Sequence, residues 1–132
     1  MAAPATDKTQ TLPKLLATCH CGAVSVEAPR KPRRLTSCNC SICRRTGALW
    51  AYYPLAQVQV TAAPGATQAY VWGDKSLELV RCSTCGCITH WQPIAPIPGS
   101  RMGVNARNFE PGAVDGVRVR RLDGALSWKF LD

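Results

Sequence analysis

The sequence predicts a small, mainly β, sandwich-like domain in which antiparallel strands form packed sheets, with very little helix. Short segments in which apolar and polar residues alternate recur along the chain, as expected of strands. Proline and glycine residues separate these segments at close intervals, and no long stretch has helical periodicity. At 132 residues the chain is long enough for one domain with its own core.

Four segments have the period-2 alternation of half-buried strands. They are Ala23–Ala28, Gln57–Ala62, Gln68–Trp72 and Val117–Leu122. Leu49–Tyr53 and Ile88–Trp91 are short and rich in aromatic or β-branched residues, so we expect strands there too.

Helix is expected in two places, as a turn or two across Ser41–Thr46 and again near Asn105–Phe109. The proline-rich segment Gln92–Ser100 is expected to be an extended loop. Residues 1–14 are polar and contain proline, so we predict a loose N-terminal tail there and place the domain in residues 15–132.

No segment has the features of a secretory signal, which needs an apolar run of about 7–15 residues behind a basic start. No stretch approaches the ~20 apolar residues that cross a bilayer, so we expect no contact with a membrane. We therefore expect a soluble, cytoplasmic protein, in which thiols stay reduced and clustered cysteines bind metal or act catalytically.

The chain is basic, with 16 Lys and Arg residues against 8 Asp and Glu residues, for a formal charge of +8. The basic residues form three short groups: Arg30/Lys31/Arg33/Arg34, Arg44/Arg45 and Arg118/Arg120/Arg121. Nucleic-acid binders concentrate such charge on one face and add recognition motifs that are absent from this sequence. We expect a solvated basic surface for the first and last groups rather than a nucleic-acid partner. The oligomeric state is left open.

Seven of the eight cysteines fall into three clusters whose spacings suit a metal ion better than a disulfide. They are Cys19-His-Cys21-Gly22, Cys38-Asn-Cys40-Ser-Ile-Cys43 and Cys82-Ser-Thr-Cys85-Gly86. Two ligands one or two residues apart both reach one ion when a tight turn points their sulfurs the same way. Eight cysteines could also pair as disulfides, but pairs followed directly by glycine favour metal, since glycine allows the positive φ of such a turn.

The first and third clusters supply two thiolates each, which completes a tetrahedral zinc site. Cys19, Cys21, Cys82 and Cys85 are therefore predicted to hold a structural zinc. Because this ion closes a long loop, its binding energy is folding energy, and loss of any one ligand should destabilise the whole domain.

The middle cluster supplies three thiolates and leaves one coordination place open, as catalytic zinc sites do. We predict that Cys38, Cys40 and Cys43 hold a second zinc with a catalytic role. Arg44 and Arg45 follow directly, and their guanidinium groups suit carboxylates, so an anionic thiol such as glutathione would fit both features.

Two further interpretations concern this middle cluster. It could instead be a second closed site that takes Cys87, His20 or His90 as its fourth ligand. Trp50 follows the cluster and is the best aromatic candidate for the wall of an adjoining pocket.

With its three clusters in this order, the chain resembles the glutathione-dependent formaldehyde-activating enzyme family, which includes centromere protein V. The resemblance runs over about Leu15–Trp128 and rests on the cluster motifs, including Arg44-Arg45 and Gly47 after the second. It implies a β-tent fold, a structural zinc on the four cysteines and a labile zinc on the three. It also implies a carbon–sulfur lyase that acts on S-hydroxymethylglutathione, the adduct of glutathione and formaldehyde.

Two points qualify what the resemblance implies. Cys87 stands where the family more often has a small residue, and it is either a small buried side chain or a competing metal ligand. The alternative function is a zinc-stabilised binding or scaffold module without catalysis, with an acidic or nucleic-acid partner, as the chromosomal role of centromere protein V implies.

Overall fold

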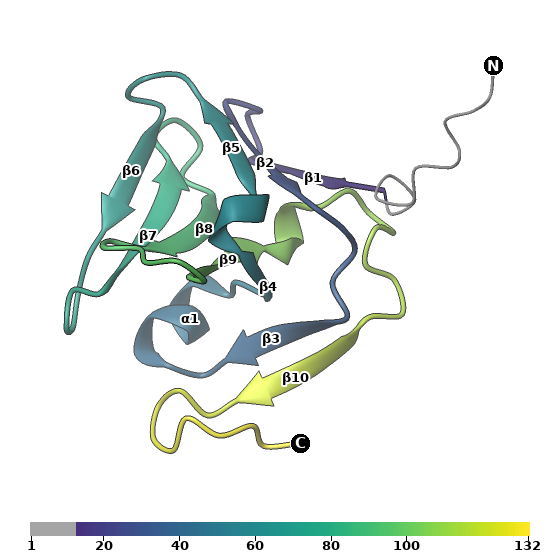
Figure 1. The fold of residues 1–132 in the computed structure, drawn as a ribbon, viewed down its shortest axis with the longest axis vertical. Coiled ribbons are helices and arrows are strands. Elements are labelled where there is room, and N and C mark those ends of the chain that lie inside the picture. The colour runs from purple at the N-terminus through teal and green to yellow at the C-terminus, as the bar shows by residue number, and fades with distance from the viewer. Residues whose placement is uncertain (1–12) are drawn as a thin grey trace.

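Residues 13–132 are described by a computed structural model, in which ten strands form two sheets and one short α-helix lies beside the larger sheet (Figure 1). The strands are β1 (Leu15–Thr18), β2 (Val24–Ala28), β3 (Arg34–Cys38), β4 (Trp50–Pro54), β5 (Gln59–Ala62), β6 (Thr67–Tyr70), β7 (Leu77–Cys82), β8 (Ile88–Pro93), β9 (Arg101–Asn105) and β10 (Arg118–Leu122). The helices are α1 (Ser41–Thr46) and the single 3₁₀ turns η3 (Leu55–Gln57) and η4 (Ala106–Asn108).

The strands are arranged in a small and a large sheet. The small sheet has the order β1-β2-β5, and the large sheet has the order β10-β3-β4-β9-β8-β7-β6. The prediction of a mainly β fold with two sheets is therefore confirmed. One pair departs from the antiparallel pattern, because β10 runs parallel to β3, with Arg118 opposite Arg34. The two strands are distant in the chain, so no hairpin imposes an antiparallel direction on them.

The main core combines side chains of β2 with side chains of the central strands of the large sheet. Strand β2 alternates buried and half-buried residues, and buries Val24, Val26 and Ala28. Its partners in the main cluster include Leu35, Ala51, Tyr53, Met102, Val104 and Phe109. Burial of these apolar side chains is the main favourable contribution of the core to folding.

The alternating pattern predicted strands at the right places, but only some of these strands are half-buried in the structure. Every residue of β5 is exposed, as are most residues of β6. Both strands lie at the edge of a sheet, where an alternating pattern does not ensure that another layer covers the apolar face. The sequence patterns did not predict β1, β3, β7 or β9 as strands.

Two of the three helical elements lie where helix was expected, whereas η3 was not predicted and overlaps the start of the predicted strand Gln57–Ala62. Helix α1 occupies Ser41–Thr46, with Cys40 as its N-cap and Gly47 as its C-cap at φ 72°. Turn η4 lies within the expected region near Asn105–Phe109. The expected loop Gln92–Ser100 is shorter than predicted, because β8 continues to Pro93. No helix described within residues 13–132 has the length and apolar character needed to span a membrane. All but two residues of the predicted tail 1–14 lie outside the described residues.

Candidate metal centres and the adjoining pocket

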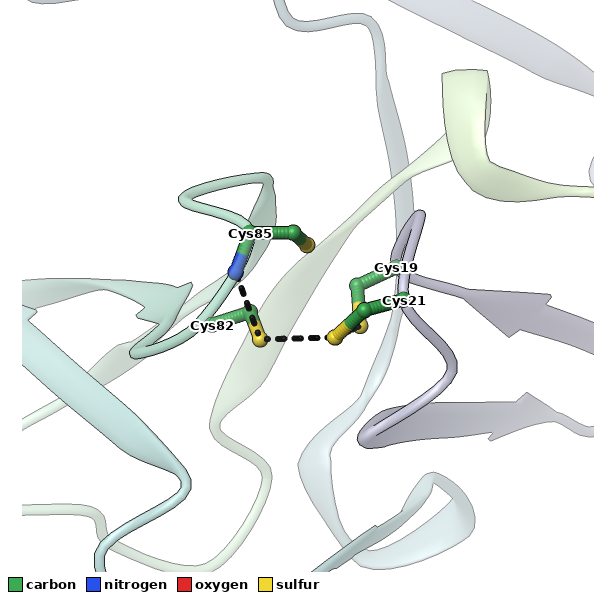
Figure 2. A group of neighbouring side chains, drawn as sticks. All are labelled: Cys19, Cys21, Cys82 and Cys85. Carbon is green, nitrogen blue, oxygen red and sulfur yellow. Dashed lines mark hydrogen bonds between the residues drawn. The ribbon is translucent and has the colours of Figure 1, made fainter.

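Four cysteines from two distant turns meet at one point (Figure 2). Cys19 and Cys21 come from the connection between β1 and β2, whereas Cys82 ends β7 and Cys85 lies in the turn that follows. Their sulfur atoms all lie within 4.8 Å of one another. The Sγ atoms of Cys19 and Cys21 are 3.7 Å apart, and those of Cys21 and Cys82 are 3.6 Å apart.

These sulfur distances fit a tetrahedral zinc site. Four ligands at a Zn–S distance near 2.3 Å are separated by about 3.8 Å along each edge of the tetrahedron. A disulfide would bring two sulfurs to about 2.05 Å, and all eight cysteines are free thiols. The four-cysteine group, Cys19, Cys21, Cys82 and Cys85, is therefore suited to a metal ion rather than to disulfides.

The turns that follow Cys19 and Cys82 direct backbone N–H groups at these sulfurs. The N–H of Val24 donates to Cys19 Sγ at 3.3 Å, and the N–H groups of Thr84 and Cys85 donate to Cys82 Sγ at 3.4 and 3.5 Å. Gly22 and Gly86 adopt φ of 83° and 78°, as the sequence predicted for the residue after each pair.

Backbone amides of these two turns also shift the pKa values of the thiols. Backbone N–H groups of Cys87 and Cys21 lower the pKa of Cys85 to about 5. The N–H of Cys85 likewise lowers the pKa of Cys82. For Cys21 the N–H of Ala23 lowers the pKa, but the neighbouring Cys82 thiol and burial outweigh it and raise the value to about 11. The turn that contains Cys82 and Cys85 thus favours the thiolate form of both cysteines.

Cys87 packs against this group without joining its ligand set. It is half-buried, and its carbonyl oxygen accepts a hydrogen bond from the N–H of Cys82 at 2.9 Å. Within residues 13–132 the sulfur of Cys87 belongs to neither candidate metal group, which agrees with a small packing residue.

The second group, the three-cysteine group, consists of Cys38, Cys40 and Cys43, whose sulfurs also lie within 4.8 Å of one another. Cys38 ends β3, Cys40 caps α1, and Cys43 lies in the first turn of α1. The N–H of Cys40 donates to Cys38 Sγ at 3.5 Å, and that of Cys43 donates to Cys40 Sγ at 3.4 Å. A strand end followed by a capped helix therefore gathers three thiols within six residues.

The three thiols differ in acidity. Burial raises the pKa of both Cys43 and Cys38 above the ordinary thiol value. Burial acts the same way on Cys40, but hydrogen bonds from the Cys43 side chain and backbone outweigh it and lower its pKa. Cys40 is thus the most readily ionised thiol of the group.

No fourth histidine, cysteine or carboxylate ligand from residues 13–132 joins the three-cysteine group. Of the candidates for that role, Cys87 packs beside the other group. His90 is buried with its Nδ1 atom 2.8 Å from the hydroxyl of Thr89, and burial lowers its pKa to about 4. The exposed His20 is also outside both groups. The described part of the chain therefore leaves this group with three protein ligands.

An apolar pocket of ≈ 140 Å³ opens beside the three-cysteine group. Its lining includes all three of these cysteines, together with Ile42, Thr46, Trp50, Tyr52, Trp72, Leu77, Leu79, Trp91, Leu122 and Trp128. Trp50 is only 3% exposed, and its Nε1–H donates to Cys43 Sγ at 3.4 Å. The indole thus contacts a thiol and lines the pocket at the same time.

The two arginines that follow the group are placed differently. Arg44 and Arg45 are exposed on α1, and neither belongs to the pocket lining. The Nη1 atom of Arg45 donates to the carbonyl oxygen of Ser41 at 2.8 Å, one turn back along the helix. Their predicted contact with a substrate carboxylate stays a prediction.

The C-terminal segment supplies part of the site that no sequence signal predicted. Gly124 is buried beside Cys38 Sγ and Cys40 Cβ. Trp128 lines the pocket, and its backbone adopts a positive φ of 58°. Asn39 fastens this segment to the cysteine loop, since it donates to Asp123 Oδ1 at 3.1 Å and accepts from the N–H of Ala125 at 2.9 Å. In the sequence, Asp123-Gly124 indicates an ordinary turn.

Two packed sheets and two clusters of free thiols define a small, mainly β protein with two groups of cysteines suited to metal ions. The model of the glutathione-dependent formaldehyde-activating enzyme family matches residues 14–115, and the chain belongs to that family. A crystal structure of a Rhodobacter sphaeroides protein, a structural-genomics target, is 31% identical with a TM-score of 0.64, and the match covers 79% of this chain and 98% of that one. No curated protein matches the chain.

Proposed function

We propose that the protein is a zinc-dependent carbon–sulfur lyase that forms and cleaves the bond between a small thiol such as glutathione and an aldehyde. S-hydroxymethylglutathione is the adduct that the family's description favours. The observation that carries this proposal is the three-cysteine group, which faces an apolar pocket and has no fourth protein ligand within residues 13–132. Membership of an enzyme family supports it independently.

We propose that both cysteine groups bind zinc, with a structural ion on Cys19, Cys21, Cys82 and Cys85 and a labile ion on Cys38, Cys40 and Cys43. The labile ion, when bound, supplies Lewis acidity that favours the thiolate form of an incoming thiol. Three ligands within six residues hold such an ion less firmly than four ligands that also join two turns.

The chain's own residues contribute orientation and exclusion of water. Trp50 donates a hydrogen bond to Cys43 and holds that sulfur against the pocket wall. Tyr52 and Trp91, which pack edge to face with ring centroids 6.0 Å apart, form an apolar wall that excludes bulk water. In the forward direction the thiol sulfur bonds to the carbonyl carbon, the C=O double bond becomes single, and the thiol proton moves to oxygen. Cleavage reverses each change.

A Cys40→Ser variant tests the catalytic assignment. Because the adduct also forms without a catalyst, the measurement is the rate of exchange between free and adduct formaldehyde by NMR, with and without enzyme. We expect the variant to remain folded, to lose one zinc per chain and to exchange at the uncatalysed rate. Cys87→Ser, which removes a thiol outside both ligand groups, should exchange like the unaltered protein. Enzyme-level exchange by a folded Cys40→Ser protein that lacks the second zinc would refute the proposal.

The second candidate is a zinc-stabilised binding or scaffold module for an acidic partner, favoured by the formal charge of +8. Such binding falls steeply with salt, because each neutralised phosphate releases a counterion. An unaltered protein that never accelerates exchange, yet is retained on DNA or RNA in a salt-sensitive way, would favour this alternative.

A further inference from the structure

A basic hollow of ≈ 660 Å³ lies beside β3, β4 and β9 of the large sheet. We use "basic hollow" for the space lined by Arg30, Lys31, Arg33, Arg34 and Arg101 around Tyr52 and Tyr53. Pro13 and Pro32 complete the lining, which contains five cations and no carboxylate. The first basic group of the sequence is therefore joined here by Arg101, which comes from a different strand.

The cations of the hollow are not neutralised within the described chain. In residues 13–132 the ion pairs are Lys14–Glu27 and Arg121–Asp132, and neither includes a cation of the hollow. Arg30 and Lys31 donate to uncharged oxygens, those of the Gln57 side chain and the Asp115 backbone.

Arg33, Arg34 and Arg101 are exposed and donate no side-chain hydrogen bond to another residue of the described chain. Arg101 instead lies over the ring of Tyr52, with its Cζ atom 5.1 Å from the ring centroid. This contact holds the guanidinium group near the ring, and its N–H groups donate to no other side chain or backbone group of the described residues. The edge of a guanidinium group matches the two oxygens of a carboxylate.

Tyr52 connects the hollow to the apolar pocket beside the three-cysteine group, because this residue lines both. Arg101 of the hollow lies over the ring of Tyr52, and the same ring packs edge to face on Trp91 of the pocket lining.

Strand β3 runs from the basic hollow, at Arg34, to the three-cysteine group, at Cys38. Arg34, Thr36 and Cys38 alternate onto one face of the strand. At about 3.3 Å per residue, the Cα atoms of Arg34 and Cys38 are about 13 Å apart. An extended peptide thiol of three residues spans roughly 10–11 Å, which is close to this separation.

We propose that the basic hollow is the carboxylate subsite for the thiol whose sulfur reaches the three-cysteine group. The ligand class is a small thiol with one or more carboxylates, and Arg34 and Arg101 are its principal partners. This inference rests on the proposed function for the identity of the reactive end. It assigns the anionic end to cations other than Arg44 and Arg45, which lie outside the pocket lining.

Binding of S-methylglutathione tests the subsite apart from the chemistry, because the methylated sulfur has no thiol to ionise. The probe is titrated into the zinc-loaded full-length protein by calorimetry. The double variant Arg34→Gln/Arg101→Gln is expected to bind it at least about 10-fold more weakly, since two charge-assisted hydrogen bonds are lost. The diethyl ester of the probe should bind the unaltered protein more weakly by a similar factor. Arg81→Gln/Lys75→Gln removes the same charge elsewhere and should bind S-methylglutathione unchanged.

The two proposals fail in different ways. The subsite would be overturned if the Arg34→Gln/Arg101→Gln variant bound S-methylglutathione as tightly as the unaltered protein. If the unaltered protein also accelerated formaldehyde exchange, the proposed function would still stand. Loss of binding in Arg44→Gln/Arg45→Gln instead would also overturn the subsite. Arginine-dependent binding without any acceleration of exchange would support the subsite and remove the proposed chemistry. Arginine-dependent binding of a DNA duplex, with no binding of S-methylglutathione, would overturn the subsite in favour of a polyanion surface.

Discussion

At the scale of single residues, Gly124 decides how closely the C-terminal segment approaches the three-cysteine group. A Cβ atom at this position would collide with Cys38 Sγ and press on Cys40 Cβ. The cost of Gly124→Ala is therefore steric rather than conformational, and it falls on two cysteines of the three-cysteine group.

We predict that Gly124→Ala weakens metal binding at the three-cysteine group by about 10–100-fold, the range typical of changes beside a metal's ligands. Release of zinc to a chromogenic chelator measures it, and the four-cysteine site should be unaffected. Leu126→Ala, in the same loop but at a side chain that is 85% exposed, is the matched control. Zinc release at the unaltered rate from Gly124→Ala would show that the close packing is not needed.

His90 makes the stability of the fold depend on pH. Burial lowers its pKa to about 4, from an ordinary value of 6.5. Between these values the unfolded chain binds a proton that the folded chain does not, so stability is lost as the pH falls from 6.5 towards 4. The loss is about 3 kcal/mol across the whole window.

We predict that His90→Gln, which does not titrate in this range, has a shallower pH dependence of the free energy of unfolding. Protonation of the cysteines destabilises both proteins at low pH, so the difference between their denaturant curves isolates the histidine. Parallel pH profiles for the two proteins would contradict this prediction.

At the scale of elements, the large sheet is shaped by a close approach of β8 and β9. Gly103 of β9 lies opposite Trp91 of β8, and a Cβ on Gly103 would overlap the indole ring. The same indole lines the apolar pocket beside the three-cysteine group. A glycine in the middle of a buried strand thus leaves room for an aromatic wall.

We predict that Gly103→Ala lowers the free energy of unfolding by about 1–3 kcal/mol, because an added methyl group overpacks the site and displaces Trp91. Denaturant unfolding checks the stability, and exchange by NMR should slow as the wall moves into the pocket. A variant as stable as the unaltered protein would mean that Trp91 can rotate away freely.

The two cysteine-rich turns were the most predictable elements, whereas several strands were not. Short spacings and a following glycine define a metal-binding turn locally, so Gly22 and Gly86 could be assigned from the sequence. Strand β9 has no alternating pattern, because both of its faces are covered and four of its five residues are buried. Strand β5 has the pattern without the burial, because it is an edge strand.

At the scale of the whole molecule, the four-cysteine group joins the two sheets. Cys19 and Cys21 lie in the turn of the small sheet, and Cys82 and Cys85 lie at the end of β7 in the large sheet (Figure 2). A metal ion bound there contributes to folding, because the unfolded chain has no assembled site. The three-cysteine group spans only the end of β3 and the start of α1, so it should matter far less to stability.

We predict that Cys82→Ser abolishes cooperative thermal unfolding or lowers its midpoint by tens of degrees, since structural zinc contributes about 10–16 kcal/mol in small domains. Circular dichroism measures the transition, and Cys40→Ser, with its ligand change in the other group, should melt close to the unaltered protein. A Cys82→Ser protein that melts normally would show that the sheets hold together without the ion.

The sequence by itself determined the mainly β class, the family and the two sets of cysteines, because these depend on composition and on spacings of a few residues. Only the tertiary structure decided what surrounds the three-cysteine group. The parallel pairing of β10 with β3, the contact of Gly124 with Cys38 and the convergence of Arg34 and Arg101 each join residues far apart in the chain. No local pattern encodes such contacts, because they arise only when all strands bury their apolar faces together.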